Sequence, residues 1–263
     1  MNARSGKGSA EGSASPADRP IAALTAPAVD EDADVDLPNV PLLADEIAHP
    51  TFDVKPTWRG WIHAGTFPLA IAAGIVLIVL ADGAAAKASS AVFMASSLLL
   101  FGISAVYHRF NWKPSTLAVF RRIDHSNIFL LIAGTYTPLA INALPFPKNV
   151  ILLSIVWGGT LVGIAFRVFW LRAPRLLYVA LYIALGWAAM MYIVDLVNAN
   201  VATMVLVLVG GVSYTVGAVF YALKRPNPVR GVFGFHELFH SCTVIAFLCH
   251  WTAILLLVLH PVA

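Results

Sequence analysis

Seven long apolar runs follow Pro56 and constrain the fold more than any other feature of the sequence. A helix that crosses a bilayer needs about 20 mostly apolar residues, and each run is about that long. Pro, Gly, Asn and Asp, which break helices, fall in the short segments between the runs. The predicted spans lie near residues 60–81, 88–107, 124–144, 149–170, 176–194, 199–222 and 236–259. We therefore predict an all-α fold, a seven-transmembrane helix bundle.

The composition supports a protein that crosses the membrane several times. Apolar residues make up 59% of the chain and charged residues only 12%, against about 25% charged in an ordinary soluble domain. The runs also lack the polar face of a helix on the surface of a soluble protein, which excludes a soluble bundle. The basic residues occur singly or in twos and threes between apolar runs, so the chain has no patch for nucleic acid.

Charge is distributed unevenly between the two ends of the chain. Of the 14 acidic residues, ten lie within residues 1–56, together with only four basic residues. This segment is rich in Ser, Ala, Pro and Asp and contains no apolar core of a signal peptide. Its composition cannot bury enough apolar surface to offset the entropy of folding. We predict a disordered acidic cytoplasmic tail over residues 1–56 and a seven-helix membrane domain over residues 57–263.

The basic residues between the spans predict the orientation of the bundle. Successive connections lie on alternate sides of the membrane, and one side carries only two basic residues, Lys87 and Lys148. Basic connections remain in the cytoplasm, so we expect a cytoplasmic N-terminus, an outside C-terminus and location in the plasma (cytoplasmic) membrane. This orientation is the reverse of that of a G-protein-coupled receptor and argues against that class. The other side holds Lys55, Arg59, Arg109, Lys113, Arg121, Arg122, Arg167, Arg172, Arg175, Lys224, Arg225 and Arg230.

Ionisable residues gather at one end of three predicted spans. Such residues are costly inside a membrane and indicate function. His108 ends the second span, with Ser104 one turn before it, and Asp124 begins the third span. His236 and His240 begin the seventh span. All five residues fall at the same depth on the predicted cytoplasmic side, so we expect them to form one site.

The three histidines have the spacing of metal ligands. His236 and His240 are four residues apart, so they share a helix face with Cβ atoms about 6 Å apart, and His108 from a facing helix would supply a third nitrogen. Three imidazoles and one water form the open tetrahedral arrangement of a catalytic zinc site, and this donor set favours zinc over other divalent ions. Asp124 could bind or orient the water, and Ser104 could bond to Asp124 or to the water.

Three further residues leave alternatives open. Residues 236–240 also read H-E-x-x-H, the pattern of zinc proteases in which the Glu is general base. An intramembrane metalloprotease is therefore an alternative, although Glu237 lies about 100° around the helix from His236. His63 belongs either to the outer shell of the site or to the membrane interface. His250 is about 21 Å along the helix from His236, so we predict that it packs helices together.

Several motifs, in order along the chain, resemble those of a known family. They are SAVYH at 104–108, RIDHS at 122–126, AGTYTP at 133–138, HELFH at 236–240 and CH at 249–250. Together they resemble the hemolysin III family of the progestin and adipoQ receptor (adiponectin-receptor-like) superfamily, over about residues 57–260. The resemblance implies a zinc ion held by His108, His236 and His240 in the cytoplasmic leaflet, with Asp124 near a metal-bound water. Adiponectin-receptor relatives are linked to ceramide hydrolysis.

A zinc site at the depth of lipid headgroups suits hydrolysis of a lipid amide or ester. Zinc activates water and polarises a carbonyl, Asp124 would act as general base, and apolar walls would bind acyl chains. We therefore expect a ceramidase-like hydrolase with Asp124 and Ser104 as catalytic residues and a membrane lipid as substrate or ligand. A non-catalytic, zinc-stabilised lipid sensor or regulator of membrane properties fits the same residues. A hemolysin-type pore is suggested by the family name alone.

Overall fold

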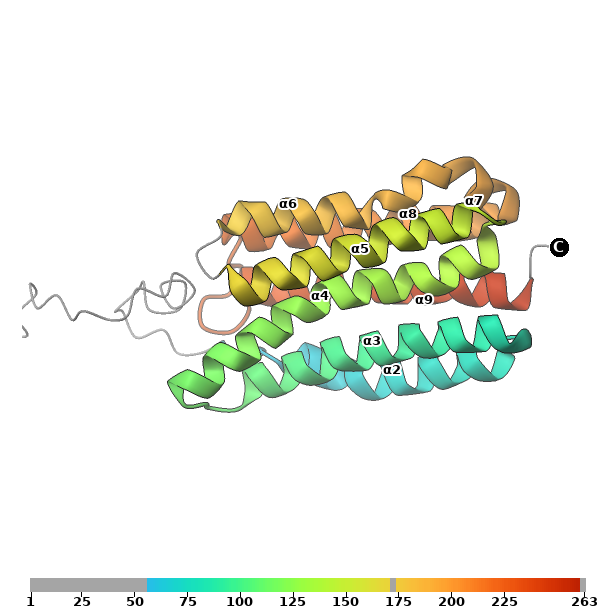
Figure 1. Cartoon of the computed structure of the whole chain (residues 1–263). Helices are drawn as coiled ribbons and strands as arrows, with labels where there is room; N and C mark the ends of the chain where they lie inside the picture. Colours follow the sequence, from blue (N-terminus) through green and yellow to red (C-terminus); the bar gives the residue numbers. More distant parts are fainter. Residues whose placement is uncertain (1–55, 171–173, 261–263) are drawn as a thin grey trace, which may run out of the picture. The chain divides into compact units, whose positions relative to one another are not determined.

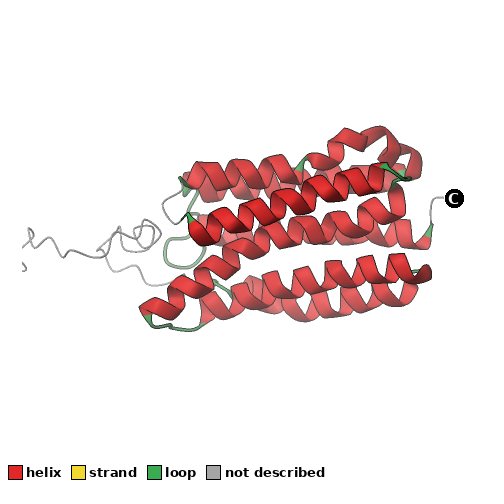
Figure 2. Ribbon diagram, viewed as in Figure 1, coloured by secondary structure: helices red, strands yellow, loops and turns green. Residues whose placement is uncertain are grey.

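The computed structural model describes residues 56–170 and 174–260, and nearly all of them are helical (Figure 2). No strand occurs in these two ranges, so the predicted all-α class is confirmed. The predicted tail over residues 1–56 lies outside the described residues, apart from Pro56. The elements are α2 (Trp61–Leu80), α3 (Gly83–Arg109), α4 (Pro114–Ala143), α5 (Lys148–Phe169), α6 (Arg175–Gly186), the 3-10 helix η1 (Ala188–Tyr192), α7 (Ile193–Ala199), α8 (Val201–Leu223) and α9 (Phe235–Leu259).

Seven helical segments make up the predicted membrane bundle. Six are long and apolar enough to cross a membrane, with α6, η1 and α7 acting together as one of them. The seventh, α4, is less apolar, yet it packs against α3, α5 and α9 (Figure 1). Its polar side chains bond to backbone carbonyls, as Asn127 does to Leu99 at 2.9 Å and Thr135 to Leu131 at 2.8 Å. Such pairing is what a polar residue needs where water is absent.

Helix α4 begins ten residues before the predicted third span. Pro114 occupies its first turn, where the missing N–H costs no hydrogen bond, and the helix then continues through Arg121 and Arg122. A span predicted from hydropathy ends at charged residues, because hydropathy reports how apolar a segment is and not whether it is helical. Asp124 therefore lies within a continuous helix and not at its first residue, which corrects the predicted start.

The predicted fifth span is not one continuous helix. It breaks after Gly186, where the chain forms η1 before it resumes as α7. The Tyr136 hydroxyl from α4 enters the break: it donates to the Gly186 carbonyl at 2.6 Å and accepts from the Ala189 amide at 2.8 Å. Helices kink where a side chain inserts into the backbone ladder. The break therefore depends on a residue about 50 positions earlier, and a local sequence pattern cannot reveal it.

Replacing Tyr136 tests this account of the break. We expect Tyr136→Phe to lower the free energy of unfolding by about 2 kcal/mol, since it leaves a buried carbonyl and a buried amide without partners. Thermal unfolding in detergent measures the effect. Tyr214→Phe is the matched control, because the Tyr214 hydroxyl has no hydrogen-bond partner within the described ranges. Equal loss of stability in both variants would contradict the role of Tyr136.

Candidate metal centre

Three histidines meet at one end of the bundle. His108 comes from the last turn of α3, and His236 and His240 come from the first two turns of α9. One nitrogen of each lies within 4.8 Å of the others, and the Nε2 atoms of His108 and His236 are 3.2 Å apart. Two nitrogens held 2.0–2.1 Å from a tetrahedral ion are about 3.3 Å apart. The closest pair thus has the spacing that zinc requires.

The donor chemistry of the cluster also fits a metal ion. His108 and His240 are buried, and the Nδ1 atom of His240 has no hydrogen-bond partner among the residues that the structure describes. Buried polar atoms are nearly always partnered, so an open imidazole nitrogen needs an explanation. Within the described ranges this is the single group of three or more His, Cys, Asp or Glu residues placed to hold a metal. Three imidazoles are a donor set typical of zinc.

Asp124 and Ser104 lie beside the three histidines. The Oδ2 atom of Asp124 is 3.9 Å from Nε2 of His108, and Ser104, one turn before His108 on α3, lines the same pocket as Asp124. Both side chains are buried. Asp124 is not among the side chains whose ligand atoms all lie within 4.8 Å of one another. It therefore lies next to the group of candidate ligands rather than within it.

Aromatic packing holds α2, α3 and α9 at the correct separation. The Phe247 ring of α9 packs edge-on against Phe101 of α3, with centroids 5.1 Å apart. His63 of α2 stacks on His240, with ring centroids 3.8 Å apart and planes 13° apart. Only 2% of His63 is exposed. His63 therefore belongs to the outer shell of the site, which decides between the two roles predicted for it.

The start of α2 also passes close to His108. Gly60 precedes the helix with φ of 83°, a left-handed conformation that favours glycine. A Cβ atom at this position would lie 3.0 Å from the Cβ of His108. Any larger residue would therefore strain the backbone and press on a candidate ligand.

Glu237 is engaged in holding the first turn of α9. Its side chain is fully buried, its Oε1 accepts from Nε of Arg59 at 3.0 Å, and its Oε2 accepts from the Gly234 amide at 2.8 Å. The amides of Thr57 and Trp58 add backbone bonds to the α8–α9 connection. The Glu237 carboxylate thus ties α9 to the segment before α2 and stabilises the turn that carries His236.

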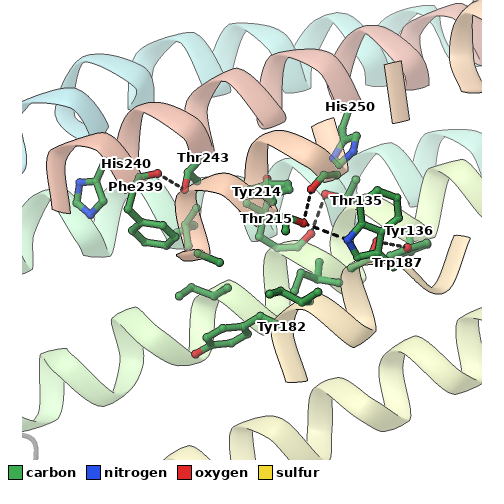
Figure 3. A pocket seen from close by; sticks show the side chains of 18 of the residues that line it. Thr135, Tyr136, Tyr182, Trp187, Tyr214, Thr215, Phe239, His240, Thr243 and His250 are labelled. Atoms are coloured by element: carbon green, nitrogen blue, oxygen red, sulfur yellow. Dashed lines mark hydrogen bonds between the residues drawn. The ribbon is translucent and has the colours of Figure 1, made fainter. Parts of the chain in front are cut away.

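A largely apolar pocket extends from the histidines into the bundle (Figure 3). Residues of α2, α3, α4, α6, α8 and α9 line it, and the space between their atoms is about 990 Å³, including the part open to the surroundings. Asp124, Ser104 and His240 line the end near the metal centre. His250, which also lines it, is ten residues after His240 on α9, or about 15 Å along the helix. The pocket is therefore long and continuous with the candidate metal centre.

Two other histidines lie outside the cluster. His250 packs against α8, with Nε2 3.3 Å from the Val207 carbonyl, as predicted. His125 contacts the Arg121 carbonyl and the Tyr221 hydroxyl, at 2.7 and 3.0 Å, and so joins α4 to α8.

Two features of the region could not be predicted from the sequence. Arg167, expected in a connection, is buried in the last turn of α5, with its guanidinium carbon 4.3 Å from the centre of the Tyr178 ring. Tyr182, Trp187 and Tyr214 line the pocket, and no local pattern marks them because the pocket forms only when separate helices pack.

An all-α bundle with a buried histidine cluster beside an apolar pocket defines a class of multi-pass membrane protein. A family profile described as "Haemolysin-III related" matches residues 53–251, a range that includes all five candidate site residues. The chain therefore belongs to the haemolysin III family, as its motifs predicted.

Two bacterial relatives show the extent of the similarity. The chain is 36% identical over 138 residues to the "Hemolysin-3 homolog" of Bacillus subtilis (strain 168). The aligned residues make up 52% of this chain and 64% of the relative, which is less than two thirds of the relative's length. It is 36% identical over 161 residues to "Hemolysin-3" of Bacillus cereus, which covers 60% of this chain and 73% of the relative.

Metal content tests the cluster directly. Elemental mass spectrometry of the detergent-purified chain should find about one zinc per chain in the wild type and a large loss in His108→Ala, His236→Ala and His240→Ala, because each variant removes one of three nitrogen ligands. His250→Ala is the matched control, a buried histidine of the same helix that should retain the metal. A wild type free of metal without exposure to chelators would contradict the assignment.

Proposed function

We propose that this chain is a zinc-dependent hydrolase of a lipid amide or ester, with a ceramidase-like reaction. The observation that carries the proposal is the continuity of three features: a three-histidine cluster, a buried carboxylate beside it, and a long apolar pocket lined by His240 of the cluster and by that carboxylate. A membrane lipid could place its acyl chain in the pocket and its amide or ester bond near the histidines.

The residues present supply the roles that such a reaction requires. His108, His236 and His240 would hold zinc, which supplies a Lewis acid and lowers the pKa of a bound water. Asp124 would take a proton from the attacking water at a carboxylate oxygen. It would return that proton to the amine or alcohol that leaves when the acyl C–N or C–O bond breaks. Ser104 lines the same end of the pocket, and its hydroxyl would hydrogen-bond to that carboxylate and orient it. A general base of this kind contributes a factor of about 10² to 10⁴ to the rate.

The apolar walls determine where the substrate lies. Leu100, Ile128, Leu131 and Leu139 line the pocket along its length, and burial of acyl methylenes against such residues contributes about 0.8 kcal/mol each. Ligand pockets commonly combine apolar walls with a few polar groups in this way.

We also propose that the site lies in the cytoplasmic half of the plasma membrane. Arg59 lies just before α2 and Arg109 ends α3, at the same end of these helices as His63 and His108. Basic residues at the ends of spans favour the cytoplasmic side. A cytoplasmic N-terminus and an outside C-terminus would follow.

The geometry favours hydrolysis over the other functions that fit the sequence. A purely structural zinc in a lipid sensor favours a fourth direct protein ligand, whereas Asp124 is not part of the group whose ligand atoms all lie within 4.8 Å of one another. An intramembrane protease would need a free Glu237, but its carboxylate is held by Arg59 and Gly234. A hemolysin-type pore needs a polar path, and the pocket walls are largely apolar.

Replacing Asp124 separates the enzyme from its alternatives. Asp124→Asn preserves the size of the side chain, so we expect it to retain about one zinc per chain and to lose at least about 100-fold in turnover, because the amide cannot take the proton. The assay measures acyl release from a panel of ceramides and acyl esters in detergent. Ser104→Ala, which removes a hydroxyl near Asp124 but leaves the carboxylate in place, should lose less.

Each alternative predicts a different result from the same variants. A structural zinc site predicts lower thermal stability in Asp124→Asn, and a pore predicts unchanged leakage from vesicles. Thr243→Val is a suitable control, because Thr243 lines the pocket while its hydroxyl bonds to the Phe239 carbonyl. Failure of zinc-loaded wild type to release acyl chains from any lipid in the panel would contradict the proposal.

A further inference from the structure

The inner part of the pocket contains two polar groups that the fold leaves without partners. They are the Nδ1 atom of His250 and the hydroxyl of Tyr214, both inaccessible to solvent and without a hydrogen bond in the described ranges. Both residues line the pocket (Figure 3), and their ring centroids are 5.6 Å apart. His250 is only 8% exposed. A fold rarely leaves two neighbouring buried polar groups unpaired unless something else pairs with them.

The hydrogen-bonding state of His250 follows from its other nitrogen. Nε2 lies 3.3 Å from the Val207 carbonyl, which can only accept, so Nε2 carries the hydrogen and Nδ1 has the free lone pair. Gly210 permits this approach, since a Cβ there would lie 2.5 Å from Nε2 of His250. The pocket thus presents one acceptor, from His250, and one group that can donate, from Tyr214.

Neighbouring polar groups in the pocket are already paired. Trp187 donates from Nε1 to the Thr215 hydroxyl at 3.0 Å, and that hydroxyl donates to the Gly211 carbonyl at 2.8 Å. The Tyr136 hydroxyl is occupied at the break between α6 and η1. His250 and Tyr214 are therefore the groups in this part of the pocket that remain open to a ligand.

We propose that His250 and Tyr214 form a second polar subsite, which binds a hydroxyl group carried on the chain of an otherwise apolar ligand. A hydroxyl can donate to Nδ1 of His250 and accept from Tyr214, so it satisfies both groups. A ketone can only accept and would leave Nδ1 unpaired. A carboxylate would bring an unpaired charge into an apolar region.

The subsite adds a substrate feature to the proposed function. The subsite rests on the proposed function only because it assumes that the pocket binds a lipid. Binding at the subsite does not require that the lipid be hydrolysed. His250 lies about 15 Å along α9 from His240. The hydroxyl would therefore be borne well along the acyl chain, far from the bond near the metal centre.

A binding series tests the subsite. The probes are long-chain fatty acids of one length, each with a single hydroxyl group at a different carbon, and the unsubstituted fatty acid. Native mass spectrometry of the detergent-purified full chain gives the dissociation constants. We expect wild type to bind one member of the series about tenfold more tightly than the unsubstituted acid, the effect of one or two hydrogen bonds.

Variants identify the source of that preference. Tyr214→Phe and His250→Leu should each reduce the preference to about twofold or less, and Tyr214→Phe preserves the shape of the pocket. Thr243→Val, which changes a paired hydroxyl in the same pocket, should preserve the preference. Equal binding of all members by wild type would overturn the subsite and leave the hydrolase proposal intact. No binding of any fatty acid would overturn both.

Discussion

The pairing of buried polar groups is the constraint on which this structure depends. Inside a bilayer, water cannot satisfy an amide, a hydroxyl or an imidazole, so each must find a partner in the protein. Tyr136 of α4 is an example: its hydroxyl bonds to the Gly186 carbonyl and the Ala189 amide, the two backbone groups left open by the break between α6 and η1. Among the described residues, several buried groups lack a partner. Those of His63, His240, Tyr214 and His250 line one pocket, whereas those of Ser90, Ser126 and Arg167 lie outside it.

The same constraint explains how much could be predicted from the sequence. A seven-helix fold follows from runs of apolar residues, because only helices satisfy the backbone in lipid. The convergence of His108, His236 and His240 follows from their position at the ends of spans on one side. The bounds and continuity of helices were mispredicted where they do not follow the apolar runs. Helix α4 continues through two arginines, and the fifth span breaks to accommodate a tyrosine from another helix.

The pocket and the support of the site were beyond prediction from sequence for a physical reason. Tyr182, Trp187 and Tyr214 line one pocket only because α6 packs against both α4 and α8, and nothing in their local sequence indicates this. Glu237 illustrates the opposite error, because its motif suggests a catalytic base. The structure shows an ion pair to Arg59, 178 residues away, that anchors the helix bearing two of the candidate ligands. The spacing of motifs was enough to locate the histidine cluster. The role of a neighbouring residue such as Glu237 became clear only from its contacts with distant parts of the chain.

In the site that we propose, three imidazoles hold one zinc ion at one end of a lipid-binding pocket. X-ray absorption at the zinc edge of the purified chain tests it most directly, because it reports the ligand atoms themselves. We predict three imidazole nitrogens at about 2.0–2.1 Å and one oxygen ligand. A spectrum that requires sulfur ligands, or fewer than three imidazoles, would contradict the account.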